Sequence, residues 1–360
     1  MFRIKSENIF SIFASNMDKR KILILSIVIL TILLSSFTFY FYQVIYSPNF
    51  LVEKESRYLY IPTGSDFEDV QRIIYDNGFV NDPVAFGILS KFMNYDQLVK
   101  PGRYLIERNA NNIDVIRKLR AGEQEPIRIT FNNARLFSDV AAKLTVRLEL
   151  DSVLFLKVLK EPATAQKYGF NEESFRCMFI PNTYEVYWTI TANELIERMH
   201  QEYERFWTQN RREKASTLGL DQVQVTILAS IVEAEVSHYD EAPKVAALYL
   251  NRLKRNMFLQ ADPTLKYALG DFTIQRVLNI HKEIDSPYNT YKYLGLPPGP
   301  INFPSIKSLD AVLNSEDHNY LYMCAKADFS GYHEFSTNLR QHNINARKYQ
   351  NALNRARIYR

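Results

Sequence analysis

The stretch Leu228-Ala-Ser-Ile-Val-Glu-Ala-Glu235 carries most of what the sequence indicates about fold and chemistry. Helical spacing aligns Leu228, Ile231 and Glu235 on one face, so an acid ends an apolar stripe. Burial there disfavours the carboxylate and raises its pKa, and a glutamic acid that stays protonated near neutral pH suits general acid catalysis. The alternative is a glutamate at a helix end with its charge in water, and periodicity does not decide between the two.

Two more carboxylates lie close by in sequence. Glu233 projects from another face of the same helix, near small side chains that leave room for a ligand, and Glu241 starts the next predicted helix. The positive end of that helix favours an ionised Glu241. The six histidines form no HExxH motif, and the chain has no GxSxG, Walker A or GxGxxG sequence. Its two cysteines, Cys177 and Cys324, are too few for a cysteine-held cluster. We therefore predict neither a metal site nor a cofactor.

The segment at 22–42 is apolar and has no charge, glycine or proline. As a helix it would extend ~32 Å, about the thickness of a bilayer core. Lys19, Arg20 and Lys21 precede it and the next charge is Glu53, which predicts a single-pass anchor with a cytoplasmic N-terminus. A cleaved signal peptide would need a small-x-small site after it, and the following residues do not supply one. The expected location is the bacterial inner (cytoplasmic) membrane, with the bulk of the chain extracytoplasmic.

The charge of the 360-residue chain, +4 overall, is concentrated at its two ends. Lys and Arg dominate the segment before the apolar stretch, and the last part of the chain, from Phe335 onward, contains six of them and no acid. The part between is therefore mildly acidic. This distribution argues against nucleic acid as a partner. Apolar residues make up 46% of the chain, enough for a sizeable core.

The remaining pattern predicts two α+β domains after the anchor. The predicted boundaries are a basic cytoplasmic segment at 1–21, an anchor at 22–46, a small domain at 57–126 and a larger one at 127–360. Strands are expected at 58–61, 127–131, 320–326 and 333–336, and the main helices at 67–77, 83–92, 112–121, 193–209, 222–236, 241–256 and 339–357. Pro181-Asn-Thr-Tyr184 is interpreted as a chain break, and the part beyond the helix at 241–256 as a loop-rich region that contains Asp262-Pro263, Ser286-Pro287 and the prolines at 297–300.

Several segments in order resemble the endolytic murein transglycosylases, the MltG/YceG family. They are LASIVEAE (228–235), KVAALYLNRL (244–253), LQADPT (259–264), SPYNTY (286–291), GLPPGPI (295–301) and the surroundings of His333 and Asn338. The turn KPGRY (100–104) resembles the family's small LysM-like domain. The chain departs from the family pattern at Asn132-Asn133, Arg176-Cys177 and Asn182.

The resemblance implies a lytic transglycosylase that cleaves MurNAc–GlcNAc bonds within peptidoglycan glycan strands and leaves 1,6-anhydroMurNAc ends. The family's catalytic glutamate falls on Glu235. Peptidoglycan synthases are partners that the family implies. The residues expected to bind substrate or support the site are Glu233, Glu241, Asn251, Gln260, Asp262, Tyr288, Asn289, Thr290, His333 and Asn338. Glu235 is expected to line a groove beside Tyr288 and Asn289.

Two alternatives remain open from the sequence. One is a muramidase-type hydrolase with Glu233 or Glu241 as the second carboxylate, because glycoside hydrolysis normally uses two carboxylates. The other is a non-catalytic glycan-binding scaffold of the cell-wall synthesis machinery.

Overall fold

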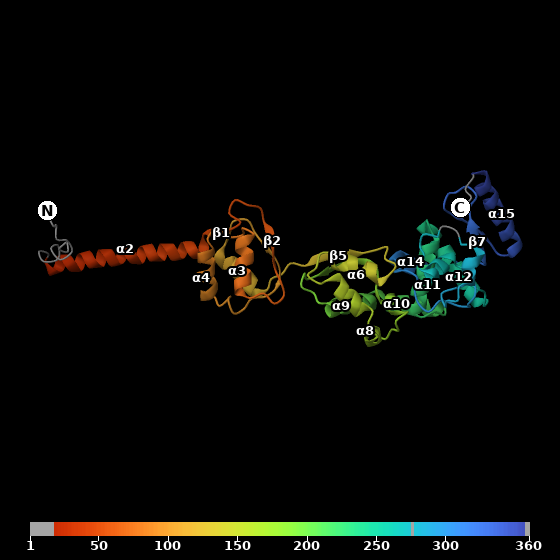
Figure 1. Ribbon diagram of the computed structural model, residues 1–360, viewed down its shortest axis with the longest axis horizontal. Coiled ribbons are helices and arrows are strands. Elements are labelled where there is room, and N and C mark those ends of the chain that lie inside the picture. The colour runs from red at the N-terminus through yellow and green to blue at the C-terminus, as the bar shows by residue number, and fades with distance from the viewer. Residues whose placement is uncertain (1–17, 275–276, 357–360) are drawn as a thin grey trace, which may run out of the picture. The chain divides into compact units, whose positions relative to one another are not determined.

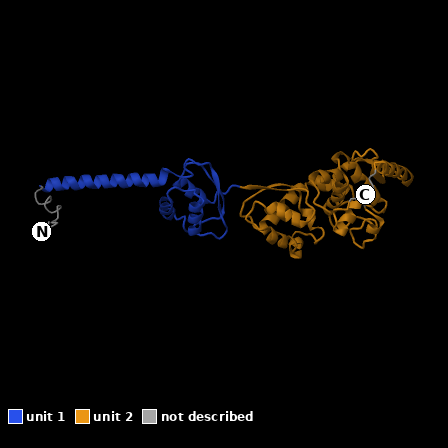
Figure 2. Cartoon of the chain, turned by 45° about the horizontal axis from the view of Figure 1, so that its top comes forward, with its two compact units in different colours: residues 1–125 blue, residues 126–360 orange. Residues whose placement is uncertain are grey.

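The computed structural model describes residues 18–274 and 277–356 (Figure 1). The chain divides into unit 1, residues 1–125, and unit 2, residues 126–360, each with its own apolar core (Figure 2). Both units mix helices with short antiparallel strand pairs, which confirms the predicted mixture of helix and strand. Most of the predicted segment 1–21 lies outside the described residues.

Helix α2 (Lys19–Tyr46) contains the predicted membrane anchor. It is long and apolar enough to cross a membrane, and its large side chains are exposed along most of its length. Its last turn packs against the core of unit 1, because Val44 is buried in that core and the Asn112 side-chain amide donates to the Val44 carbonyl at 2.8 Å.

After α2, the described part of unit 1 packs three helices around two strand pairs. In one pair, each residue of β2 faces a residue of β3, from Arg57 opposite Ile106 to Ile61 opposite Gly102. The helices start where the sequence provides caps, at Asp66, Asp82 and Asn111. The elements are β1 (Pro48–Phe50), β2 (Arg57–Ile61), α3 (Phe67–Asp76), α4 (Pro83–Phe92), β3 (Gly102–Ile106), β4 (Ala110–Asn111) and α5 (Asn112–Ala121).

Unit 2 begins with the antiparallel pair of β5 and β6, continues through a helical body and ends with the pair of β7 and β8 beside α15. Its strands are β5 (Ile127–Phe131), β6 (Asn182–Val186), β7 (Tyr322–Ala325) and β8 (His333–Ser336). Its α-helices are α6 (Phe137–Thr145), α7 (Ser152–Leu159), α8 (Pro162–Lys167), α9 (Ala192–Phe206), α10 (Gln209–Thr217), α11 (Gln222–Glu235), α12 (Ala242–Lys254), α13 (Asp262–Leu269), α14 (Ile306–Leu313) and α15 (Leu339–Arg355). Three short 3-10 helices are η1 (Phe175–Met178), η2 (Tyr239–Glu241) and η3 (Asn279–Glu283).

Helix α11 is the central helix of unit 2. All its residues from Val225 to Val232 are buried, so the apolar stripe seen in the sequence is only one side of a helix that is covered all round. The two hydroxyls in this stretch are accommodated by hydrogen bonds. Ser230, for example, donates to the Ile227 carbonyl and accepts from the Ile301 amide. Burial on every side fixes the direction of the C-terminal end, where Glu235 lies.

Two expectations about local structure were wrong, and one was incomplete. Residues 182–184 of the predicted break at 181–184 belong to strand β6, which pairs with β5 more than fifty residues earlier, a partner that local sequence does not reveal. The region expected to be loop-rich also holds two short helices, α13 and α14, because Pro263 occupies the first turn of α13, where proline is tolerated, and Ser305 caps α14. The predicted helix at 193–209 ends at Phe206 and a separate helix, α10, follows.

Candidate active site

Glu235 is the last residue of α11 and lines a cavity of about 310 Å³, which we call the acid cavity. The helix starts at Asp221, whose side chain and that of Gln224 form a capping box, and it ends where Val236 takes an extended conformation. The polar residues that line the acid cavity come from α11, α12, α13, β8, α15 and two loops; they are Glu235, Tyr249, Arg252, Gln260, Asp262, Tyr291, His333 and His342.

The environment of Glu235 favours its neutral form. Burial of the carboxyl raises its pKa to about 7, and the charge of Asp262 acts in the same direction. A hydrogen bond from the Tyr249 hydroxyl to Glu235 Oε1, at 2.9 Å, opposes the shift, as do the charges of Lys266 and Arg252. A carboxyl that is about half protonated at neutral pH is able to donate a proton and to take one back.

Helix α12 supplies Tyr249 and Arg252, two cavity residues that the sequence analysis did not single out. Arg252 is buried and donates to the backbone carbonyls of Leu321, at 2.6 Å, and Leu259, at 2.8 Å. It thereby joins the start of β7 to the loop before α13. Tyr249 and Arg252 are three residues apart and share a helix face, and this spacing is the feature of the sequence that could have identified them. A tyrosine in an apolar stretch, however, resembles a core residue.

The loop at 286–291 reaches the acid cavity through Tyr291. The Tyr291 hydroxyl donates to Asp262 Oδ1 at 2.5 Å, and both residues line the cavity with Glu235. Burial raises the pKa of Tyr291 and of Tyr249, so both phenols stay protonated as hydrogen-bond donors.

The other predicted residues of this loop lie behind the cavity and support it. Asn289 is fully buried, and its side-chain amide donates to the carbonyls of Lys282 and Ile284, both at 2.8 Å. Thr290 accepts from the Ala261 amide at 3.0 Å, which joins the loop to the segment before α13. Glu235 therefore does not lie beside Tyr288 and Asn289 as expected, because their side chains point into the protein instead of into the cavity.

Tyr288 belongs to a partly buried polar group with Glu173 and Arg176. Its hydroxyl donates to Glu173 at 2.5 Å and accepts from Arg176 at 3.2 Å. The Arg176 guanidinium also lies 4.9 Å from the centre of the Tyr267 ring. These contacts make Tyr288 a support of the loop.

Glu241 and His333 form a buried pair at the edge of the acid cavity. Both oxygens of Glu241 are used, one by the His333 amide at 3.0 Å and the other by His333 Nδ1 at 2.9 Å. The carboxylate thereby fixes the orientation of the imidazole ring, which lines the cavity.

The remaining predicted residues divide between the cavity wall and the scaffold. Gln260 lines the cavity and accepts from Arg252 at 3.3 Å, with its backbone held by Thr290. Asn251 lies outside the cavity lining and donates to the carbonyls of His318 and Tyr320, at 2.7 and 3.2 Å. Asn338 is exposed and caps α15.

Residues 59–348 match the family described as the YceG-like family. The chain belongs to the YceG-like family. It is 30% identical over 326 residues to the endolytic murein transglycosylase of Bacillus subtilis (strain 168), which covers 84% of this chain and 88% of that relative. It is 24% identical over 368 residues to the endolytic murein transglycosylase of Streptococcus pneumoniae serotype 2, which covers 92% of this chain and 66% of that relative.

A solved structure of a YceG-like protein from Listeria monocytogenes is also similar. Its TM-score is 0.53 at 26% sequence identity, and the match covers 81% of this chain and 98% of that chain.

Two residues at which this YceG-like chain departs from the family pattern differ in their exposure to solvent. Arg176 is buried against Tyr267 and Tyr288, whereas Asn182 is exposed on β6. Cys177 is buried, and both cysteines are free.

A second cavity of about 690 Å³ borders α11 at Glu233 and Ala234. Arg135, Lys143 and Lys266 contribute positive charge to its lining. Glu233 accepts from the Ser305 amide at 2.6 Å, at the N-terminus of α14. Glu233 and Glu235 therefore line different cavities, although one residue separates them.

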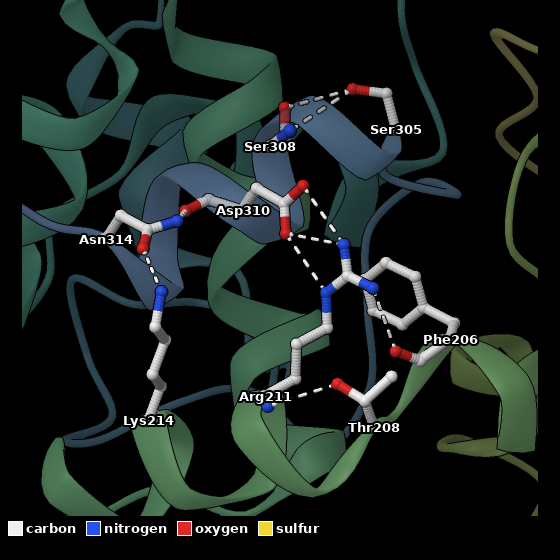
Figure 3. A network of polar contacts seen from close by, with 8 residues as sticks. All are labelled: Phe206, Thr208, Arg211, Lys214, Ser305, Ser308, Asp310 and Asn314. Atoms are coloured by element: carbon white, nitrogen blue, oxygen red, sulfur yellow. Dashed lines mark hydrogen bonds and ion pairs between the residues drawn. The ribbon is translucent and has the colours of Figure 1, made fainter.

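Figure 3 shows a polar network that fixes helix α14. Ser305, which caps this helix, is the residue whose amide donates to Glu233. Arg211 of α10 donates from two nitrogens to Asp310 of α14, at 3.1 and 3.2 Å, and Lys214 donates to Asn314. Arg211 also bonds to the Phe206 carbonyl and lies 4.0 Å from the centre of the Phe206 ring.

Among the described residues, no group of three or more His, Cys, Asp and Glu side chains is placed to hold a metal ion.

Proposed function

We propose that this chain is a membrane-anchored endolytic murein transglycosylase that cleaves MurNAc–GlcNAc bonds within glycan strands and leaves 1,6-anhydroMurNAc ends. Membership of the YceG-like family and the names of its relatives support peptidoglycan lytic transglycosylase activity. The observation that carries the mechanism is Glu235, a carboxyl with a pKa of about 7 on the wall of a cavity.

In the proposed reaction Glu235 acts first as acid and then as base. Protonated Glu235 gives its proton to the glycosidic oxygen as the bond from C1 to that oxygen breaks, so the leaving sugar departs as an alcohol. The C6 hydroxyl of the same muramyl residue bonds to C1, and its proton returns to the Glu235 carboxylate. No water is consumed and the acid is regenerated. One carboxyl is therefore sufficient, unlike in hydrolysis.

The other residues of the acid cavity take supporting roles in this proposal. Tyr249 holds the carboxyl through its hydrogen bond and stabilises the ionised form between the two steps. Gln260, Tyr291 and His333 line the cavity and would hydrogen-bond sugar hydroxyls, and Glu241 orients His333. Asn251, Tyr288, Asn289, Thr290 and Asn338 support the surrounding loops and helices by the bonds described above.

The anchoring and domain roles belong to the same proposal. Helix α2 would cross the inner membrane with the basic N-terminus in the cytoplasm, and the two units would lie on the extracytoplasmic side. Unit 1 would act as a LysM-like domain that binds glycan, and peptidoglycan synthases would be the partners of the membrane-bound enzyme. The length and apolar composition of α2 support its role as the anchor.

A muramidase-type hydrolase is the second candidate, and one observation favours it. Asp262 lines the acid cavity together with Glu235, and its charge raises the pKa of Glu235. The second carboxylate of a hydrolase would therefore be Asp262, since Glu233 lines the other cavity and both oxygens of Glu241 are bonded to His333.

Mass spectrometry of digested glycan strands tests the proposal. The full chain in detergent would be compared with Glu235→Gln and with the matched control Glu233→Gln. We expect anhydromuramyl ends from the wild type, a loss of roughly 10²–10⁴-fold in Glu235→Gln, and substantial activity in Glu233→Gln. Reducing ends that carry ¹⁸O from labelled water would instead establish the hydrolase. Cleavage that survives in Glu235→Gln would disprove the assignment of the acid, and no cleavage by the wild type would favour the scaffold.

A further inference from the structure

Helix α4 of unit 1 has an exposed face that is mostly apolar. Val84, Ile88 and Phe92 are spaced by four residues, so they lie within one narrow arc of the helix, and their exposed fractions are 65%, 50% and 73%. The opposite face, with Phe86 and Leu89, packs into the unit 1 core. Single apolar residues are common on protein surfaces, but three on one helix face form a patch that needs an explanation.

This face is continuous with the proposed membrane-spanning helix. The rings of Phe92 and Phe41 meet edge to face, with their centres 6.3 Å apart, and α4 and α2 are in contact. In Figure 1, α4 lies on the side of unit 1 from which α2 emerges, and it runs across the direction of α2. The junction is part of the folded unit, because Val44 is buried in its core.

The depth of Phe41 in a membrane follows from the helix rise. Counted from Ile22, the first uncharged residue, Phe41 lies ~30 Å along the helix, which is about the thickness of the hydrocarbon core. Phe41 and its neighbours Tyr40 and Tyr42 would then occupy the outer interface, where aromatic residues gather. Because Phe92 lies beside Phe41, α4 would be at the same depth.

We infer that α4 rests in the outer interface of the membrane, with Val84, Ile88 and Phe92 buried among lipid headgroups and the ends of the acyl chains. The occupant of this apolar face is the lipid bilayer. Lys91 adjoins the same face and is exposed, where it would meet lipid phosphates. The inference rests on the proposed membrane anchoring by α2. Unit 1 would then lie flat on the membrane surface instead of being held away from it.

Spin-label accessibility in vesicles tests this inference. The full chain with Cys324→Ser would be labelled at Ile88→Cys or Phe92→Cys and reconstituted into vesicles of phosphatidylethanolamine and phosphatidylglycerol. Phe37→Cys, inside α2, is the reference for lipid. Arg72→Cys, on α3 with a side chain 67% exposed, is the reference for water. The ratio of collisions with oxygen to collisions with a water-soluble nickel complex reports the depth of each label.

We expect the ratio at 88 and 92 to be several-fold above that at 72 and to approach that at 37. A ratio at 88 and 92 equal to that at 72, with 37 in lipid, would overturn the inference and leave the anchor in place. A label at 37 that is accessible to nickel would overturn both. All the labelled positions are exposed in the fold, so these substitutions are compatible with folding.

Discussion

The hydroxyl of Tyr249 donates a 2.9 Å hydrogen bond to Oε1 of Glu235, and it links the middle of α12 to the last residue of α11. The bond stabilises the carboxylate, whereas burial of the same group stabilises the acid. The balance leaves the pKa of Glu235 at about 7. An acid with this pKa passes readily between its two protonation states at neutral pH.

The Tyr249 bond provides a test through the pH profile. Because the acid form must be present at the start of the reaction, kcat/KM of the wild type should fall as the pH rises through about 7. Tyr249→Phe removes an interaction that lowers the pKa of Glu235, so the falling limb should move to higher pH by roughly one unit. Tyr239→Phe, an exposed tyrosine, is the control and should leave the limb in place. An unmoved limb in Tyr249→Phe would show that this bond does not set the ionisation of Glu235.

The raised pKa of Glu235 also predicts how stability depends on pH. In the unfolded chain the carboxyl ionises near its usual pKa of 4.5, and in the folded chain it ionises near 7. Between these values the unfolded state loses its proton first, so the wild type is destabilised as the pH rises. Glu235→Gln does not ionise. Below pH 4 the free energy of unfolding of Glu235→Gln should show no gain over that of the wild type. Above pH 7 the gain should reach at most about 3 kcal/mol.

Unfolding temperatures of the two proteins at pH 4 and pH 7.5 measure this effect, and the low-pH pair is the internal control. A difference in unfolding temperature between the two proteins that is the same at both pH values would contradict the raised pKa of Glu235.

The bonded pair of Glu241 and His333 predicts that Glu241 and its neighbour Asp240 differ in their effect on kcat/KM. Glu241→Gln keeps the size of the side chain but weakens its hold on the imidazole, and we expect kcat/KM to fall by roughly tenfold, as for a charge-assisted hydrogen bond of about 1.4 kcal/mol. Asp240 is the matched control, since it is exposed and bonds to Tyr332 at 3.1 Å. Asp240→Asn should change kcat/KM less than twofold. Equal losses in both variants would remove the proposed role of Glu241 in orienting His333.

The polar network in Figure 3 predicts that two ion pairs contribute unequally to the free energy of unfolding. Arg211 and Asp310 are partly buried and share two short contacts, whereas Arg128 and Glu185 pair on the surface of β5 and β6. A double-mutant cycle on the first pair should give a coupling free energy of about 1 kcal/mol or more. The surface pair should give about 0.5 kcal/mol or less. Thermal unfolding of the four variants of each cycle provides the measurement, and a larger coupling for the surface pair would contradict the prediction.

Several features of the fold were predictable because their causes are local. The helices of unit 1 were predicted close to their observed positions, and the structure shows them capped by Asp66, Asp82 and Asn111, residue types that favour this position. The strand β6 was missed for the opposite reason. Its partner β5 is remote in sequence, and Pro181, directly before the strand, favoured a break.

The candidate site shows the same division. Glu235 was singled out by its position at the end of an apolar helix face, and the structure places it on a cavity wall. Tyr291 and Arg252 line the same cavity but were not singled out, while Asn289, which was, lies buried behind the loop. Which residues of a loop face a cavity depends on how the loop packs, and its sequence shows no period that reveals this.

The apolar helix α2, the helix that ends at Glu235 and the likeness to a family were all readable from the amino-acid order, because periodicity, charge spacing and motif order are properties of neighbouring residues. The groups that surround Glu235 depend instead on the folding of distant segments. Tyr249, Asp262 and Tyr291 come from separate segments, and the pKa of a buried carboxyl depends on the atoms packed around it in space. Burial is created when distant segments meet, and for that reason it appears only in the folded chain.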